Sequence, residues 1–227
     1  MIDVSRLKHV CELPVEAFAS HGETVVTPGG SNYVFRDQGE PVLAVAHLDT
    51  VLPGTPFSHD GERVYCPALD DRLGVHLLLD VLPLLGVRFD LLLTDGEERG
   101  CSTARWFVPP RRYNWMFSFD RAGTDVVLYQ YDTPESRRLL HRAGFRVGVG
   151  SYSDIADLWF LGCAGFNFGC GYHGQHRLDC YADLGETREM VARFVAFWEL
   201  HRARRLARRL SRIKSTQAQS GQRVQPR

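Results

Sequence analysis

The chain has 227 residues, 44% of them hydrophobic, enough for one large α/β domain or two small ones. Its 27 basic and 27 acidic residues give a net charge of zero. No apolar run approaches the roughly 18 residues of a membrane-spanning helix, and no basic segment followed by an apolar one opens the chain. We therefore expect a cytoplasmic protein without a membrane partner. Its six cysteines are scattered, which favours reduced thiols over disulfides.

The charges are unevenly distributed along the chain. From His201 onward there are nine basic and no acidic residues, which leaves 18 basic and 27 acidic residues before that point. Leucines and arginines recur there at helical spacing, a pattern that can bind nucleic acid or an acidic membrane surface. Because no aromatic platform or reading motif accompanies it, we do not expect nucleic-acid binding. We interpret it as the solvated end of a terminal helix, where cations suit the helix dipole.

The first half of the chain begins with a predicted helix, bent or broken at Pro14. The strand that ends at Ala46 is apolar throughout, as in a central strand covered on both faces. A later helix stops at Pro109 and Pro110. In chain order we predict a helix at 5–20, strands at 24–27, 32–36, 41–46 and 63–65, a helix at 70–85, a strand at 89–94 and a helix at 101–108.

The second half continues the alternation of strands and helices and contains no internal repeat. In chain order we predict strands at 115–119 and 126–131, a helix at 134–142, a strand at 145–149, a short helix at 153–160, a strand at 164–168 and a long helix at 186–213. This alternation predicts an α/β fold, a three-layer α/β/α sandwich around a central mixed, mostly parallel sheet. We expect a single catalytic domain over residues 1–214, ending in the basic helix, and a polar, unstructured tail over 215–227.

Two adjacent acids, Glu97 and Glu98, follow the apolar strand at 89–94 within the segment Gly96-Glu97-Glu98-Arg99-Gly100. Adjacent carboxylates at the end of a buried strand repel each other and lose hydration, so a fold that keeps them there usually supplies a cation. We interpret that cation as a metal ion. The alternative is a solvated turn at the start of a helix, where acids suit the helix dipole.

Other acids and imidazoles also fall at the ends of predicted strands. In an open α/β sheet, ligands bind beyond the carboxyl ends of the strands, where residues distant in sequence meet. Imidazole nitrogens and carboxylate oxygens are the expected ligands of zinc, or of cobalt or manganese in its place. Five such side chains are candidate ligands, which is too many for one tetrahedral ion with an open position. They suit two ions that share one of the carboxylates, that of Asp70. The candidate metal ligands are His47, Asp70, Glu98, Asp120 and His173.

Two further carboxylates are candidates for roles beside the metals. Glu97 is free to act as a general base, which takes a proton from a water bridged by the two metals and delivers it to the leaving amine. Asp49, two residues beyond His47, is placed to accept the other N–H of that imidazole and fix its tautomer. Asp71 either contacts the metal ligands without binding a metal itself or is an ordinary acid at the start of a helix.

The last ligand has alternatives. Cys170, His173, His176 and Cys180 form the tight pattern Cys-x2-His-x2-His-x3-Cys, which also suits a structural zinc knuckle. His176 is the alternative to His173 at the predicted two-metal site. The position of His173 directly after Gly171 and Tyr172 favours His173.

The order of these motifs resembles the signature of the co-catalytic zinc exopeptidase superfamily, which includes bacterial aminopeptidases, tripeptidases and glutamate carboxypeptidase-type enzymes. Many relatives carry an inserted second domain. The intervals from His47 to Asp70 and from Asp120 to His173 leave little room for one here, so the chain resembles a compact single-domain member. The motifs that carry the resemblance are His47-Leu48-Asp49, Ala68-Leu69-Asp70-Asp71-Arg72-Leu73-Gly74, Gly96-Glu97-Glu98-Arg99-Gly100, Asp120 and Gly171-Tyr172-His173.

The resemblance implies a zinc-dependent hydrolase of peptide or amide bonds, of the aminopeptidase type, with a peptide as its substrate. A deacylase acting on N-acyl amino acids is the alternative among enzymes. A catalytically silent metal-binding or interaction protein that uses its basic C-terminal helix is the alternative from another class. No pattern assigns an oligomeric state.

Overall fold

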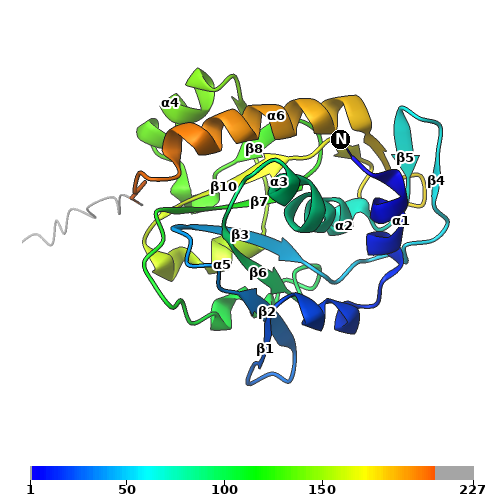
Figure 1. Ribbon diagram of the computed structural model, residues 1–227, viewed down its shortest axis with the longest axis horizontal. Coiled ribbons are helices and arrows are strands. Elements are labelled where there is room, and N and C mark those ends of the chain that lie inside the picture. The colour runs from blue at the N-terminus through cyan, green and yellow to red at the C-terminus, as the bar shows by residue number, and fades with distance from the viewer. Residues whose placement is uncertain (1, 208–227) are drawn as a thin grey trace, which may run out of the picture.

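An eight-stranded mixed sheet runs through the centre of the computed structural model, which describes residues 2–207 (Figure 1). The strand order is β1-β2-β6-β3-β7-β10-β8-β9. The four central strands, β6, β3, β7 and β10, are parallel, whereas β1 and β2 at one edge and β8 beside β10 introduce antiparallel pairs. The strands are β1 (Glu23–Val26), β2 (Asn32–Arg36), β3 (Val42–His47), β6 (Asp90–Thr94), β7 (Trp115–Arg121), β8 (Asp125–Val127), β9 (Arg146–Val147) and β10 (Ala164–Gly169).

Strand β3 is buried along its whole length, as its apolar sequence predicts. Because side chains alternate across a strand, Ala44 and Ala46 belong to one hydrophobic core and Leu43 and Val45 to another on the opposite face. The sheet is therefore covered on both faces. The prediction of an α/β fold with a mixed, mostly parallel central sheet is confirmed.

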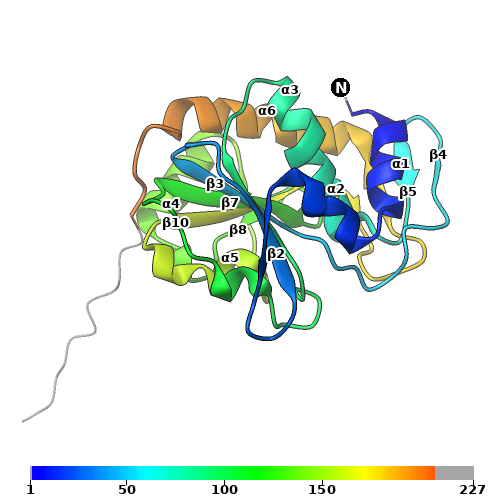
Figure 2. The same cartoon turned by 60° about the horizontal axis from the view of Figure 1, so that its bottom comes forward.

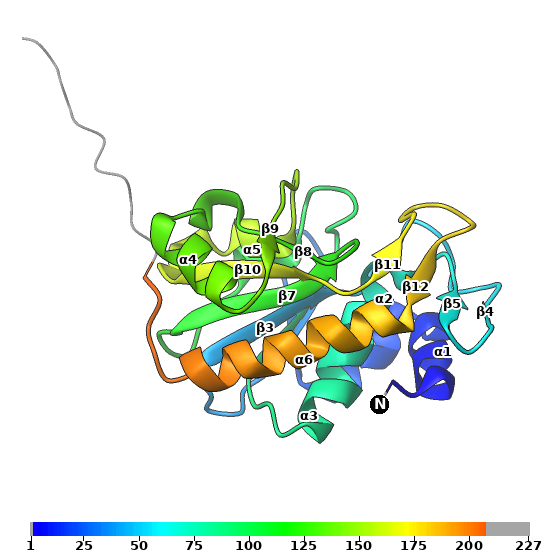
Figure 3. The same cartoon turned by 90° about the horizontal axis from the view of Figure 1, so that it is seen from above.

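The larger core lies under α1 (Val4–Glu12), α2 (Leu69–His76), α3 (Leu82–Leu84) and α6 (Leu184–His201). Figures 2 and 3 show α2, α3 and α6 together on one side of the sheet, with α6 running across β3, β7 and β10. Aromatic side chains join the layers: the ring centroids of Phe117 in β7 and Phe194 in α6 are 4.5 Å apart. Helix α4 (Pro134–Arg142) adds Leu139 and Leu140 to this core.

The opposite face of the sheet is covered by shorter elements. These are α5 (Asp154–Asp157) and the 3₁₀ and loop residues Ala104, Phe107, Tyr131 and Leu158, which share a core with Leu43 and Val45. The first segment of the chain after α1, Val15–His21, is also a 3₁₀ helix, consistent with the predicted break at Pro14. Within residues 2–207 the structure offers no helix with the length and apolar character that a membrane crossing demands.

A small antiparallel sheet at one end of the molecule was only partly predicted. Its order is β11 (Tyr172–His173), β12 (Tyr181–Asp183), β5 (Arg63–Tyr65) and β4 (Ser58–His59), and only β5 was expected. Figure 3 shows it beside α1 and the start of α6. The loop between β11 and β12 carries residues 174–180.

The terminal helix is shorter than predicted, because α6 ends at His201. After it, the chain turns so that the N–H of Leu206 donates to the carbonyl of Asn114 (2.8 Å), while its carbonyl accepts from Ala164 (2.7 Å). Burial of the Leu206 side chain, which is 3% exposed, favours this pairing over a continued helix. The rest of the predicted helix and the tail at 215–227 lie outside the described residues.

Two other predicted elements also differ. The helix expected at 101–108 is only the 3₁₀ turn Thr103–Trp106, which begins at a Ser102 hydroxyl cap and ends as Phe107 adopts an extended conformation. The strand expected at 126–131 ends at Val127, because Tyr129 has a positive φ of 44° and starts the 3₁₀ turn Tyr129–Tyr131.

Candidate metal centre

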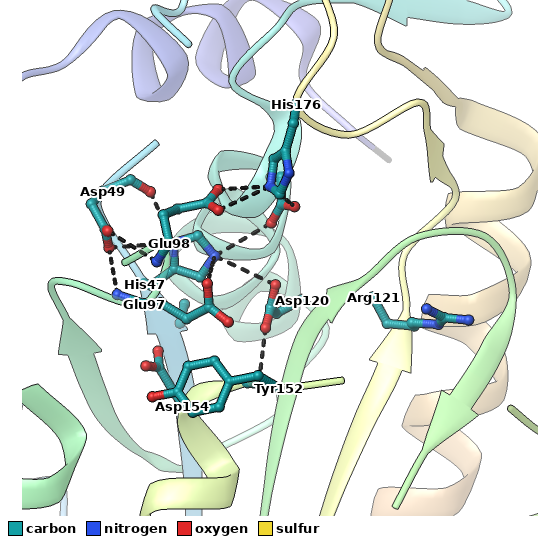
Figure 4. Close-up of polar contacts among 12 residues, drawn as sticks. His47, Asp49, Glu97, Glu98, Asp120, Arg121, Tyr152, Asp154 and His176 are labelled. Atoms are coloured by element: carbon teal, nitrogen blue, oxygen red, sulfur yellow. Dashed lines mark hydrogen bonds and ion pairs between the residues drawn. The ribbon is translucent and has the colours of Figure 1, made fainter. Parts of the chain in front are cut away.

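A cluster of carboxylates and imidazoles lies beyond the carboxyl ends of the central strands (Figure 4). The parallel pairing of β6, β3 and β7 brings the ends of these strands to one edge of the sheet. Helix α2 begins at the same edge, and the loop between β11 and β12 closes over it. The side chains that meet there are His47 from β3, Asp70 from α2, Glu97 and Glu98 from the turn after β6, Asp120 from β7, and His176 from the loop between β11 and β12.

Asp70 lies between the two histidines. Its Oδ1 atom is 3.3 Å from Nε2 of His47, and its Oδ2 atom is 3.3 Å from Nε2 of His176. The same nitrogen of His47 is 3.4 Å from Oδ1 of Asp120, while that of His176 is 2.9 Å from Oε2 of Glu98. The geometry thus forms two imidazole-carboxylate sets that share the Asp70 carboxylate.

A main-chain carbonyl fixes the orientation of the His47 ring. Its Nδ1 atom is 2.8 Å from the main-chain carbonyl of Asp49, so Nδ1–H donates there and Nε2 is the ring nitrogen that faces the carboxylates. The Asp49 carboxylate lies farther off, at 3.6 Å. It instead accepts the N–H groups of Glu97 and Glu98, each at 3.2 Å, and so holds the turn that carries the paired acids.

Asp120 is held by two neighbouring side chains. Its N–H donates to the Asn167 amide oxygen (3.1 Å), and the Asn167 amide N–H donates to the Asp120 carbonyl (3.0 Å). The hydroxyl of Ser153 donates to Oδ2 of Asp120 at 2.8 Å. With Oδ2 engaged in this way, Oδ1 faces His47.

The protein alone does not balance the charge of this cluster. Burial, followed by repulsion from Asp120, raises the pKa of Glu97 to about 8, and burial and repulsion from Asp70 raise that of Glu98 to about 7. Burial also raises the pKa of Asp120. Burial opposes ionisation of His47, yet contacts with Asp120, Asp49 and Asp70 raise its pKa well above the usual value.

Two buried atoms of the cluster have no hydrogen-bond partner among the described residues, Nε2 of His47 and Oδ1 of Asp70. Buried polar atoms of this kind are normally satisfied. Ligand atoms of His47, Asp70 and Glu98 lie within 4.8 Å of one another, as do those of His47, Asp71 and Asp120. Nitrogen and oxygen donors this close together fit a divalent metal ion such as zinc, cobalt or manganese.

Asp71 is less exposed to solvent than an ordinary acid at the start of a helix. It is fully buried, and neither of its carboxylate oxygens has a hydrogen-bond partner among residues 2–207. A Cβ atom on Gly74 would lie 2.0 Å from its Oδ1, so glycine makes room for the carboxylate. The sequence signal for this residue was the Asp70-Asp71 doublet followed three residues later by glycine.

His173 does not reach the cluster. Its Nε2 atom is 2.7 Å from Oε2 of Glu186, and its ring stacks on Tyr181 with centroids 5.1 Å apart. In the part of the chain that the structure describes, the two sets of side chains close enough to share a metal ion contain no cysteine, and neither His173 nor His176 belongs to them. His176, in contrast, contacts Asp70 and Glu98. The two sets do not form the alternative zinc knuckle.

An open cleft of about 350 Å³ lies in front of the cluster. Asp70, Glu97, Glu98 and Asp120 line its floor. Tyr129, Arg121, Ser151, Tyr152, Gln175 and His176 line its sides. The hydroxyl of Tyr129 donates to the carbonyl of Tyr152 at 2.8 Å, which fixes one wall. A small substrate can therefore approach the side chains that converge on Asp70.

Comparison with known proteins supports the fold. No family model matches the sequence, and no curated protein matches it. Among solved structures, the aminopeptidase PepT from Bacillus cereus matches with a TM-score of 0.64 at 10% identity, covering 86% of this chain and 96% of that one. A tripeptidase from Staphylococcus aureus matches with a TM-score of 0.63 at 10% identity, covering 90% of this chain and 100% of that one.

An aminopeptidase from the archaeon Desulfurococcus kamchatkensis also matches, with a TM-score of 0.60 at 13% identity, covering 87% of this chain and 94% of that one. The TM-scores show a shared fold, and at identities this low they show the fold alone. The fold that the resemblance implies is therefore confirmed.

Proposed function

We propose that this chain is a two-metal aminopeptidase, which hydrolyses the peptide bond after the N-terminal residue of a peptide. The observation that carries the proposal is the Asp70 carboxylate, whose two oxygens face separate imidazoles, each with its own further carboxylate. The likeness of the fold to solved aminopeptidases and a tripeptidase supports it.

His47, Asp70 and Asp120 would hold one ion, and Asp70, Glu98 and His176 the other, with zinc the best fit to these donors. This assignment replaces His173 by His176. When bound, two such ions lower the pKa of water and stabilise negative charge on a carbonyl oxygen. Both effects promote amide hydrolysis at neutral pH.

Glu97 supplies the proton transfer. Its carboxylate lines the cleft, and its Oε2 atom is 3.8 Å from Nε2 of His47, farther than the carboxylates of Asp70 and Asp120. In the proposed mechanism Glu97 accepts the proton of the attacking water and then donates it to the amine of the departing peptide, as a general base followed by a general acid. Asp49 acts as a positioning residue by holding the turn that bears Glu97.

The test is a metal-dependence assay on a substrate panel. Protein stripped with a chelator and reloaded with zinc is incubated with free-amine dipeptides and tripeptides and, separately, with N-acetyl amino acids. We expect release of the N-terminal residue from peptides only, abolished by the chelator and restored by zinc. Cleavage of the N-acetyl compounds alone would instead establish the deacylase, and no cleavage by metal-loaded protein would establish a catalytically silent protein.

A further inference from the structure

The cleft continues past Arg121 into a second hollow. Arg121 and Ala122 line both the cleft and this neighbouring hollow, which encloses about 450 Å³. Figure 4 shows the guanidinium of Arg121 directed away from the carboxylates of the metal centre. A ligand whose reacting bond lies at the metal centre therefore has space into which the rest of its chain can extend.

Most charges in the second hollow are already paired. Arg121 donates to Asp125 from Nε at 2.8 Å and from Nη2 at 3.2 Å. The imidazole of His173 lies 2.7 Å from the Glu186 carboxylate. The Arg121 guanidinium and the Glu186 carboxylate therefore both have partners within the protein.

Arg146 is the exception among the charged residues of the hollow. Its side chain is exposed and contacts the hydroxyl of Thr124 at 3.4 Å, and no carboxylate among residues 2–207 forms an ion pair with it. An exposed guanidinium without a carboxylate partner is well suited to bind a carboxylate, because it presents several N–H donors in one plane.

The surface beyond Arg146 strengthens its positive potential. Arg146 and Val147 also line a groove of about 510 Å³, whose other lining residues are Arg137, Arg138, His141, Arg142 and Phe145. Only Arg137 among these arginines has a carboxylate partner in the described residues, Asp132 at 2.6 Å. Clustered cationic side chains attract anions and raise the local concentration of anions.

We propose that Arg146 binds a carboxylate on the leaving-group side of the peptide substrate, so that the protein prefers short peptides bearing a negative charge beyond the cleaved bond. This inference rests on the proposed aminopeptidase function. An aminopeptidase has one residue on the acyl side of the cleaved bond, so the part of the substrate that extends from the cleft is the leaving group. The carboxylate comes either from the C-terminus of the peptide or from an acidic side chain.

The experiment compares three tripeptides that share the N-terminal residue best released in the substrate panel. They are Xaa-Gly-Gly as the free acid, Xaa-Gly-Gly amide, and Xaa-Gly-Glu amide. Each is tested with wild-type protein, with Arg146→Gln, and with Arg88→Gln as a control of equal charge change. Arg88 is exposed, pairs with Glu40 at 3.6 Å, and precedes β6 at the amino-terminal edge of the sheet, away from the metal centre.

We expect wild type to cleave the free acid with a lower KM than the neutral amide. Arg146→Gln should raise the KM for the free acid about two- to fivefold, because it removes one partly exposed ion pair. The kcat values and the KM for the neutral amide should not change, and Arg88→Gln should behave as wild type. A similar gain for the Glu amide would assign the effect to side-chain carboxylates as well; no gain would assign it to the C-terminus alone.

Equal KM values for the free acid and both amides, or an Arg146→Gln variant with unchanged KM for all three, would overturn the proposal. Such a result would leave the aminopeptidase function standing, because all three peptides would still be hydrolysed. Failure of metal-loaded wild type to hydrolyse any free-amine peptide would instead refute the proposed function itself.

Discussion

Oδ2 of Asp70 lies 3.3 Å from Nε2 of His176, on the side of the carboxylate opposite to His47. This contact assigns the last imidazole of the cluster to the loop between β11 and β12. It also gives Asp70 the position of a shared ligand between two donor sets. Most of the predictions below follow from this arrangement.

The two competing histidines differ in what their removal should do. We predict that His176→Ala loses one of the two metal ions per chain, since the second donor set would keep only carboxylates. His173→Ala should retain both ions and lose about 0–1 kcal/mol of unfolding free energy, because it breaks a partly exposed pair with Glu186. Elemental analysis and thermal unfolding of both variants test this. Metal loss in His173→Ala but not in His176→Ala would restore the original assignment.

Glu97 should be needed for catalysis but not for metal binding. Glu97→Gln keeps the size of the side chain and its place in the turn held by Asp49, but it cannot accept a proton. We expect kcat to fall about 10²–10⁴-fold, the usual contribution of a positioned general base. The measurement pairs kcat with metal content. Retained activity, or activity lost together with the metal, would argue against this role.

The two ions should leave at different rates. The side chain of His47 is fully buried, whereas that of His176 is 47% exposed. An ion held by exposed donors is more accessible to a chelator, so we predict biphasic release on mixing with a chelator, with activity lost in the faster phase. In His176→Ala the fast phase should be missing. A single phase with an amplitude of two ions in wild type would contradict this prediction.

These assignments show which parts of the site are predictable from sequence. His47, Asp70, Glu98 and Asp120 were expected together because each follows or precedes an element of a parallel sheet, and such ends meet at one edge. His176 could not be preferred over His173 in this way. It is placed by a short hairpin in which Gly174 and His176 both have positive φ, values of 71° and 62°, and periodicity does not encode such a loop.

The end of the chain gives a similar lesson for the fold. The leucines and arginines after His201 keep helical spacing, so a local pattern predicts a continued helix. The structure instead buries Leu206 and pairs its main chain with Asn114 and Ala164, which lie 92 and 42 residues earlier in the sequence. A contact over such a separation overrides local propensity and has no signal in the pattern.

Asp154 provides a test of the electrostatics behind the site. It is buried, accepts a hydrogen bond from Thr94, and has a pKa raised by burial from 3.8 to about 6. Because the folded protein holds this proton more tightly than the unfolded chain, the carboxylate destabilises the fold fully above pH about 6, and the penalty disappears as the pH falls to 3.8. The cost at pH 8 is on the order of 3 kcal/mol.

Asp154→Asn should therefore be more stable than wild type at pH 8, and the difference should shrink by about 1.4 kcal/mol at pH 5, where the folded wild-type carboxyl is largely protonated. Urea unfolding of both chelator-treated proteins at the two pH values measures this. A difference that does not change with pH would contradict the raised pKa. A less stable variant at pH 8 would show that the carboxylate contributes a favourable interaction.

The central claim is that two metal ions share Asp70. Its most direct test is the metal content of wild-type protein and of Asp70→Asn, each loaded with zinc and then freed of unbound metal. The account predicts close to two ions per chain in wild type and a loss of both, or of all but one weakly held ion, in Asp70→Asn, with the folded state retained by circular dichroism. One ion per chain in wild type that survives Asp70→Asn would contradict it.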